Sequence, residues 1–215
     1  MTNNSPCVVS TLAPTRWPCP AVTLAEHVDD VLTLLDNEHL DRVVLVGHSY
    51  SGLIVGQVAD RRPEAVLRSV HVASFLPRDG RALLDDWGDD LDMQELERQQ
   101  VRNGGLLWAP PPHEALADET DLRPRDRDWP SARFVPHPGR TVLDPATMTR
   151  PVTEQDVIFV ATALLGTDPH ADLPPEVTGT MPNRWRLRTL TGGHWPMFSA
   201  PNALQAVLEE EAVRA

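Results

Sequence analysis

Short apolar runs alternate with amphipathic segments along most of the chain. Apolar positions at helical spacing predict helices over 24–36 and 50–60 and a final helix over 201–212. Thr23 and Glu26 form a capping-box pattern at the start of the first helix, because the threonine oxygen can accept an early N–H and the glutamate can reach back to the cap. Strands are expected at Val8–Ala13, Arg42–Val46, Leu67–Ala73, Val157–Ala163 and Arg186–Leu190.

This alternation is interrupted once, between residues 77 and 150. Ten prolines lie from Pro77 to Pro151, both ends included, and no clean strand is expected there. Strand and helix patterns then resume, and no internal repeat is found. The order predicts an α/β fold with a mostly parallel sheet, in which a lid at 77–150 is inserted into a core formed by 1–76 and 151–215.

Composition and charge narrow the function classes. The chain has 215 residues, and 31 acidic against 19 basic side chains give a formal net charge of −12, which argues against nucleic acid or an anionic membrane as a partner. All the basic residues are arginine, which excludes lysine-based catalysis such as a Schiff base. Cys7 and Cys19 are too few for a disulfide framework, and we find neither a signal-peptide pattern nor an apolar run of about 18 residues. We expect a cytoplasmic protein without a cofactor.

Residues 43–52, which read VVLVGHSYSG, carry the most informative motif. A buried strand runs into a tight turn and then into a helix, which is the context of a nucleophile elbow. Ser49 would occupy the strained apex, and the backbone N–H of Tyr50 would be the first oxyanion donor. Ser51 stands where the motif usually has glycine, with Gly52 directly after it. The competing interpretation is that Ser49 is only a helix N-cap, a position that serine favours.

A serine nucleophile needs a base that is itself oriented by a carboxylate. In this fold class the histidine follows a late strand, and among the eight histidines only His194 has that placement. His48 is expected to support the loop, because adjacent residues at an elbow point apart. The acid should follow the strand at 157–163, where Asp168 is the first candidate and Asp172 the reserve. Both could equally be solvated loop carboxylates.

The chain resembles the α/β-hydrolase superfamily, and within it the branch of small methylesterases, hydroxynitrile lyases and their bacterial esterase relatives. The matching segments read VTLAEH at 22–27, VVLVGHSYSG at 43–52, VHVASFLPRDG at 70–80 and GHWPMFSAP at 193–201. The resemblance implies a serine-dependent hydrolase with Ser49 as nucleophile and His194 as base. It places the acid directly after the strand that ends near Ala163, where strict alignment gives Leu164, so Asp168 is a displaced candidate.

The resemblance fails at the front of the chain. The family takes its second oxyanion donor from a loop after an earlier strand, and no such strand or loop precedes Val8. In the family that strand lies between those corresponding to Val8–Ala13 and Arg42–Val46. Its absence requires either that Val8–Ala13 moves inward or that another chain supplies a strand. Three explanations compete: a start codon assigned too late, a homodimer that repairs the sheet, or a degenerate and weakly active hydrolase.

The lid composition bears on the substrate. Trp87, Trp108 and Trp129 are candidates for lining a pocket, although each could simply pack the lid onto the body. The acidic run 85–92 lacks the glycine and spacing of a calcium loop, so no metal site is expected. We predict hydrolysis of a small or medium, mostly apolar carboxylic ester through an acyl-serine intermediate. The alternative is a non-catalytic ligand-binding or interaction protein. Lyase chemistry is disfavoured, because the lyases of the resembling branch add a lid lysine and this chain has no lysine.

Overall fold

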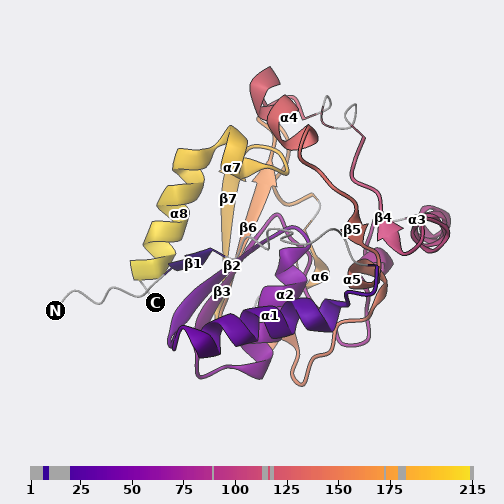
Figure 1. The fold of residues 1–215 in the computed structure, drawn as a ribbon. Coiled ribbons are helices and arrows are strands. Elements are labelled where there is room, and N and C mark those ends of the chain that lie inside the picture. Colours follow the sequence, from indigo (N-terminus) through magenta and orange to yellow (C-terminus); the bar gives the residue numbers. More distant parts are fainter. Residues whose placement is uncertain are drawn as a thin grey trace.

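A parallel sheet of five strands forms the centre of the molecule (Figure 1). The computed structural model describes residues 7–9, 20–88, 90–112, 116, 119–171, 173–178 and 183–213, with backbone only at 7–9. The strand order is β1-β2-β3-β6-β7, and every described pairing in this sheet is parallel. The strands are β1 (Cys7–Val9), β2 (Val43–His48), β3 (Val66–Val72), β6 (Val157–Ala163) and β7 (Trp185–Thr191). The predicted α/β class is therefore confirmed.

Helices cover both faces of this sheet because successive strand side chains point to opposite sides. Val43 and Leu45 pack into one apolar cluster with α1 and α2, whereas Val44 packs on the other face with α8. The described helices and helical turns are α1 (Leu24–Asn37), α2 (Ser51–Arg61), η1 (Leu83–Asp85), α3 (Leu91–Asn103), α4 (Pro124–Ser131), α5 (Arg140–Leu143), η3 (Val152–Glu154), α6 (Pro175–Thr178), α7 (Pro196–Ser199) and α8 (Pro201–Val213).

Outside residues 77–150, the long elements other than β1 lie within one or two residues of their predicted positions, whereas the 13-residue helix α3 was not predicted. The capping box of α1 is confirmed, since the Thr23 side chain accepts the Glu26 N–H at 3.1 Å and Glu26 accepts the Thr23 N–H at 2.8 Å. The first predicted strand is described only at Cys7–Val9, so residues 10–13 lie outside the described part. No described helix is long and apolar enough to cross a membrane.

The position of β1 resolves one question left by the sequence. β1 pairs directly with β2, in a register that sets Cys7 opposite Val44 and Val9 opposite Val46. Of the two arrangements expected, the first strand has therefore moved inward beside the elbow strand. In this position the backbone groups of β1 pair with β2. The homodimer stays a prediction.

The described part of 77–150 packs on the body of the molecule. It contains α3, α4, α5 and a two-stranded antiparallel sheet, β4 (Leu107–Trp108) with β5 (His137–Pro138). The sequence pattern predicted none of these elements. Leu83, Val142 and Ala146 share one apolar cluster with Leu24 of α1 and Leu53 of α2. The lid boundaries at 77 and 150 stay a prediction, because part of this segment belongs to the same core as the body.

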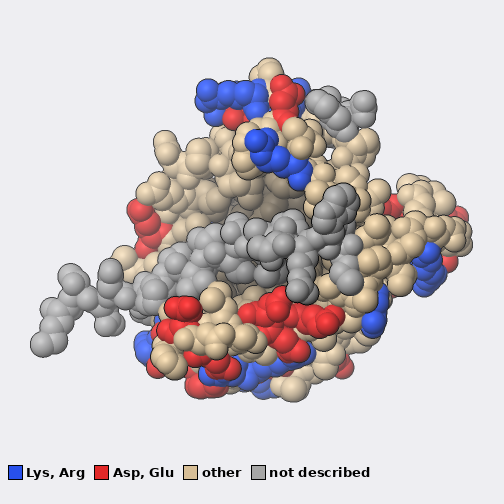
Figure 2. All heavy atoms as spheres, in the orientation of Figure 1, with Lys and Arg blue, Asp and Glu red and all other residues tan. Residues whose placement is uncertain are grey.

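Charge is distributed unevenly over the face shown in Figure 2. Acidic side chains gather over α1, and arginines gather at α4. Several α1 carboxylates are paired: Arg61 bonds Asp29 at 2.9 Å, and Arg62 bonds Asp36. Exposed pairs of this kind contribute little stability, typically about 0–1 kcal/mol, so the core carries most of the fold's stability.

Candidate active site

Ser49 lies at the turn between β2 and α2, in a strained backbone conformation. Its φ is +52°, in the left-handed region that residues with a Cβ adopt rarely. Two N–H groups hold its carbonyl, from Gly52 at 3.1 Å and from Phe75 at 3.3 Å, and its own N–H donates to Val72 at 3.2 Å. The predicted strand, turn and helix are all present, and strain at such a turn is typical of functional sites.

Gly52 provides the close packing that the motif requires. A Cβ at this position would lie 2.2 Å from the Phe75 carbonyl oxygen and 2.3 Å from Ser74 Oγ. Ser51, at the usual glycine position, is half-buried and fits with its side chain in place. The departure from the motif at Ser51 therefore leaves the elbow geometry intact.

Gly52→Ala should destabilise the fold by about 1–3 kcal/mol, because the added methyl group meets a backbone carbonyl that has little room to move. Urea denaturation followed by circular dichroism would measure this change. Ser51→Ala is the matched control, and we expect it to fall within about 0.5 kcal/mol of the unmodified chain. Equal midpoints for the two variants would contradict the close approach at Gly52.

His194 follows β7, as predicted, and faces the serine. Its Nε2 lies 3.0 Å from Ser49 Oγ, although the two residues are 145 positions apart in the sequence. Gly192 turns the chain out of β7 and donates its N–H to the Ala163 carbonyl at 2.9 Å. His48 Nε2 donates to the His194 carbonyl at 2.7 Å, which confirms that His48 supports this loop. The structure thus brings the predicted nucleophile and base within hydrogen-bond distance.

The surroundings of the pair keep the His194 ring uncharged. Burial first, and the neighbouring His48 ring second, lower the pKa of His194 to about 4. Burial likewise lowers the pKa of His48. The His194 imidazole is therefore neutral at physiological pH, with Nε2 available to accept the serine proton.

The predicted acid is not joined to this pair. Asp168 is exposed, and its Oδ1 accepts the His170 N–H at 2.9 Å. It lines the same cavity as His194, but no described hydrogen bond connects the two side chains. Asp172 lies outside the described residues. The role of Asp168 in the triad stays a prediction.

A cavity of about 880 Å³ opens beside His194. Its aromatic lining consists of Phe75 and Phe159, and it is also bounded by Arg78, Asp86 and Gln94. The three predicted tryptophans are not among its described lining residues, and their role in binding substrate stays a prediction. Trp87 stacks on Phe75 at 6.0 Å between ring centroids, and Trp108 meets Trp87 edge to face at 5.0 Å.

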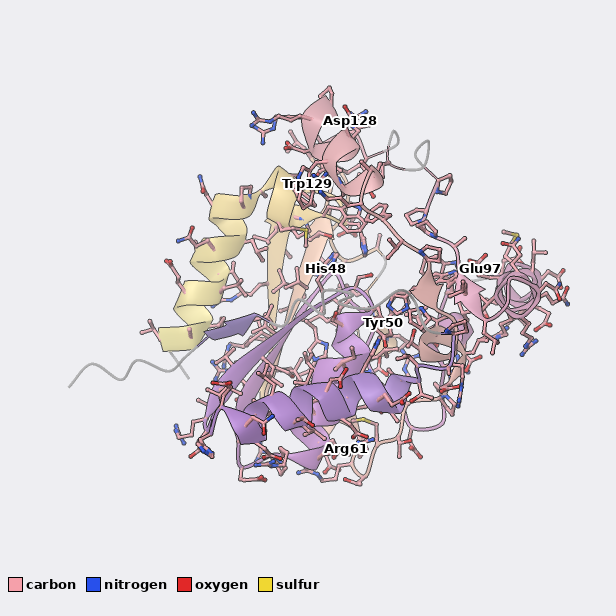
Figure 3. All side chains as sticks on the ribbon, in the orientation of Figure 1. His48, Tyr50, Arg61, Glu97, Asp128 and Trp129 are labelled. Atoms are coloured by element: carbon pink, nitrogen blue, oxygen red, sulfur yellow. The ribbon has the colours of Figure 1, made fainter. Side chains whose placement is uncertain are left out.

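The third tryptophan lies on the lid helix α4. Figure 3 shows Trp129 at the top of the view, by the helix α4. Its side chain is 55% exposed, and the Arg133 guanidinium lies 4.5 Å from its ring centroid. Trp129 also contacts Phe198 of α7, with ring centroids 6.1 Å apart. This tryptophan packs the lid against the segment that follows His194.

Sequence reasoning missed a polar cluster behind the elbow. The Tyr50 hydroxyl lies 2.8 Å from His27 Nδ1, and Thr141 Oγ1 lies 2.8 Å from His137 Nδ1. The rings of Tyr50 and His137 are 4.8 Å apart, so α1, the elbow and the lid meet here. Burial raises the pKa of Tyr50 and lowers that of His137 to about 4, which keeps both side chains neutral. No local pattern signals this cluster, because its members come from three distant segments.

The same cluster fixes the residue that carries the predicted oxyanion donor. The Tyr50 side chain is anchored by the 2.8 Å contact between its hydroxyl and His27 Nδ1. No described residue accepts a hydrogen bond from the Tyr50 N–H. That donor, at the start of α2, is thus available to a ligand next to Ser49.

Three features are typical of the α/β-hydrolase class. They are a parallel sheet covered by helices, a serine at a strained strand-to-helix turn and a histidine after the last described strand. Residues 9–207 match the model of the "Alpha/beta hydrolase family", and the chain belongs to that family.

Two curated proteins are similar to this chain over short stretches. A carbendazim hydrolyzing esterase from Nocardioides sp. (strain SG-4G) is 43% identical over 63 residues, which are 29% of this chain and 26% of that protein. Methylesterase 8 of Arabidopsis thaliana is 42% identical over 53 residues, 25% of this chain and 19% of that protein. The matched part thus spans about a quarter or less of the length of these relatives.

Solved structures show the likeness over nearly the whole chain. An extracellular α/β-hydrolase from a Paenibacillus species aligns with a TM-score of 0.71 at 17% identity, covering 92% of this chain and 82% of that one. A methylesterase from Arabidopsis aligns with a TM-score of 0.59 at 17% identity, covering 90% and 79%. At these identities the likeness shows the fold alone.

Proposed function

We propose that this protein is a serine-dependent carboxylic ester hydrolase that acts on a small or medium, mostly apolar ester. The observation that carries the proposal is the 3.0 Å approach of His194 Nε2 to Ser49 Oγ at a strand-to-helix elbow. The names of both curated relatives, an esterase and a methylesterase, support ester hydrolysis. The cavity beside His194, with Phe75 and Phe159 in its lining, supports a substrate with an apolar part.

The chemistry follows from the placement of these atoms. His194 Nε2 accepts the Ser49 hydroxyl proton while Oγ forms a bond to the ester carbonyl carbon. The carbonyl oxygen becomes an oxyanion, which accepts a hydrogen bond from the Tyr50 N–H and lies near the positive end of α2. Collapse of this intermediate breaks the bond to the alcohol oxygen, and protonated His194 returns the proton to the leaving alcohol.

Deacylation repeats these steps with water. His194 takes a proton from the water, whose oxygen bonds to the acyl carbon, and a second oxyanion forms at the same donor. When that intermediate collapses, the acid leaves and Ser49 regains its proton. The lowered pKa of His194 means that the neutral ring, the form that accepts a proton, is the populated form at pH 7.

A fluorophosphonate probe tests the proposal without knowledge of the substrate. We expect one equivalent of probe to react with the folded protein and peptide mapping to place the adduct on Ser49. Ser49→Ala and a urea-unfolded sample are the controls, and both should stay unlabelled. A folded sample that forms no adduct on Ser49 would refute the proposed function.

A further inference from the structure

A carboxylate from the lid holds the loop that carries His194. Asp121 Oδ2 accepts the Gly193 N–H at 2.6 Å, across 72 positions of sequence. A hydrogen bond to an ionised acceptor is about twice as strong as one between neutral groups. The peptide directly before the predicted base is therefore fixed by a residue that lies outside the loop after β6.

A side chain at Gly193 would meet two lid carboxylates. A Cβ on Gly193 would lie 2.9 Å from Asp121 Oδ1 and 2.4 Å from Glu119 Oε2. Two lid carboxylates thus lie beside the Gly193 backbone, and a methyl group there would require their side chains to move.

The second oxygen of Asp121 supports a role beyond stability. Asp121 Oδ1 is buried, and no described donor bonds it. Burying a polar atom without a partner costs about 1–3 kcal/mol, so this placement is unfavourable for folding alone. A buried polar atom without a partner needs an explanation, and a role for Asp121 in holding the histidine loop provides one.

The contacts of the histidine loop show what Asp121 does. Gly192 is anchored to Ala163, the His194 carbonyl is anchored to His48, and the peptide between them is anchored to Asp121. Asp168, in the loop after β6, instead bonds within its own loop. We propose that Asp121 is the positioning residue for His194, acting through the Gly193 N–H, so that the lid supplies the carboxylate that orients the base.

This inference rests on the proposed function and adds a condition to it. Because Asp121 belongs to the lid, the alignment of His194 with Ser49 depends on the lid being seated. Asp121 is not among the described residues that line the cavity, so its loss should affect the chemical step more than substrate binding.

The test compares Asp121→Ala with Asp121→Asn, using the rate of fluorophosphonate labelling and the hydrolysis of p-nitrophenyl acetate. Misplacing a catalytic group by about 1 Å can lower the rate about 100-fold, so we expect Asp121→Ala to label about 10 to 100 times more slowly, with kcat reduced and KM within about twofold. Asp121→Asn should recover most of the rate, because its amide oxygen can still accept the Gly193 N–H. Recovery by asparagine would not follow from a support that acts through its negative charge alone.

Asp126→Asn is the matched control. This lid aspartate, five positions on, pairs with the exposed Arg123 and Arg125 at the start of α4, and its loss should leave the labelling rate unchanged. Unmodified protein that labels, together with Asp121→Ala that labels within twofold of it, would overturn the inference and leave the proposed function standing. No labelling of the unmodified protein would instead refute the proposed function, and the inference with it.

Gly193→Ala gives a second way to break the contact if Asp121→Ala fails to fold. Its methyl group would force the lid carboxylates away, and we expect a loss of rate similar to that of Asp121→Ala. The double variant should be no slower than the slower single variant, because both changes remove one interaction. Losses that multiply in the double variant would contradict a shared contact.

Discussion

His194→Ala should react with a fluorophosphonate at least about 1,000 times more slowly than the unmodified protein. The described proton acceptor for Ser49 Oγ is His194 Nε2, which lies 3.0 Å away. Without this base a serine hydroxyl is a weak nucleophile. Intact-mass measurement of the adduct over time gives the rate directly. Hydrolysis of p-nitrophenyl acetate should fall in parallel, since acylation and deacylation use the same base.

His170→Ala is the matched control for this loss. His170 is exposed in the loop after β6, and its described contact with Asp168 is made by its backbone N–H rather than by its ring. We expect its labelling rate to equal that of the unmodified protein. A folded His194→Ala variant that keeps more than a tenth of the rate would show that another group activates Ser49.

The pH dependence of labelling gives an independent check on His194. The reactive form is the neutral imidazole, and burial lowers the His194 pKa from 6.5 to about 4. The rate should therefore stay level as the pH falls through 6.5 and decline only near pH 4, about tenfold for each further unit. Brief exposure to each pH, with circular dichroism as a control for unfolding, separates this titration from acid denaturation. A midpoint near 6.5 would mean that the ring is solvated.

The elbow and the base could be predicted because each has a local signature. A buried strand followed by glycine, histidine, serine and a helix predicts the conformation of Ser49 without any knowledge of distant residues. His194 follows a late strand, and the parallel sheet places the carboxyl ends of its strands at one edge. The two residues are 145 positions apart, and no sequence pattern joins them. They meet because the parallel sheet places the ends of their strands at the same edge.

The lid contacts could not be predicted in this way. Asp121 meets Gly193, and Tyr50 meets His27 and His137, across separations in the sequence that no local pattern joins. The strands β4 and β5 have two residues each, too few for an alternation to show. Choosing Asp168 relied on the chain order usual for this fold class, and chain order does not show which carboxylate reaches the histidine loop.

The pattern of side chains in β7 did not predict a buried charge, the carboxylate of Glu211. Arg186 and Arg188 stand two residues apart in β7, so they share one face of the sheet, where the sequence alone suggests solvent. In the structure both bond Glu211 of α8, from Arg186 Nη2 at 2.9 Å and from Arg188 Nη2 at 2.6 Å. Arg68 of β3 completes the group with a 3.4 Å contact to the same carboxylate. α8 is therefore fixed to the sheet by an ionic cluster in addition to its apolar contacts.

Glu211→Ala should lower the free energy of unfolding by about 3–5 kcal/mol, the usual effect of removing one partner from a buried ion pair. Burial by itself would raise the pKa of Glu211, but hydrogen bonds from Arg188 and Arg186 outweigh it and lower the pKa, so the carboxylate is charged in the folded state. Its removal leaves Arg68, which is 7% exposed, with Asp156 as its remaining carboxylate partner. For a chain of this size the melting temperature should fall by about 6–20 °C.

Glu210→Ala separates burial from charge in this prediction. Glu210 also contacts Arg188, at 3.2 Å, but its side chain is 42% exposed, whereas that of Glu211 is 0% exposed. An exposed pair contributes at most about 1 kcal/mol, so the neighbouring substitution should leave the melting temperature within about 4 °C of the unmodified protein. Calorimetry on both variants measures the difference. Equal losses of melting temperature would mean that total charge rather than the buried carboxylate fixes α8. A Glu211→Ala variant as stable as the unmodified protein would show that apolar contacts are sufficient to hold α8, namely those of Leu204, Val207 and Leu208.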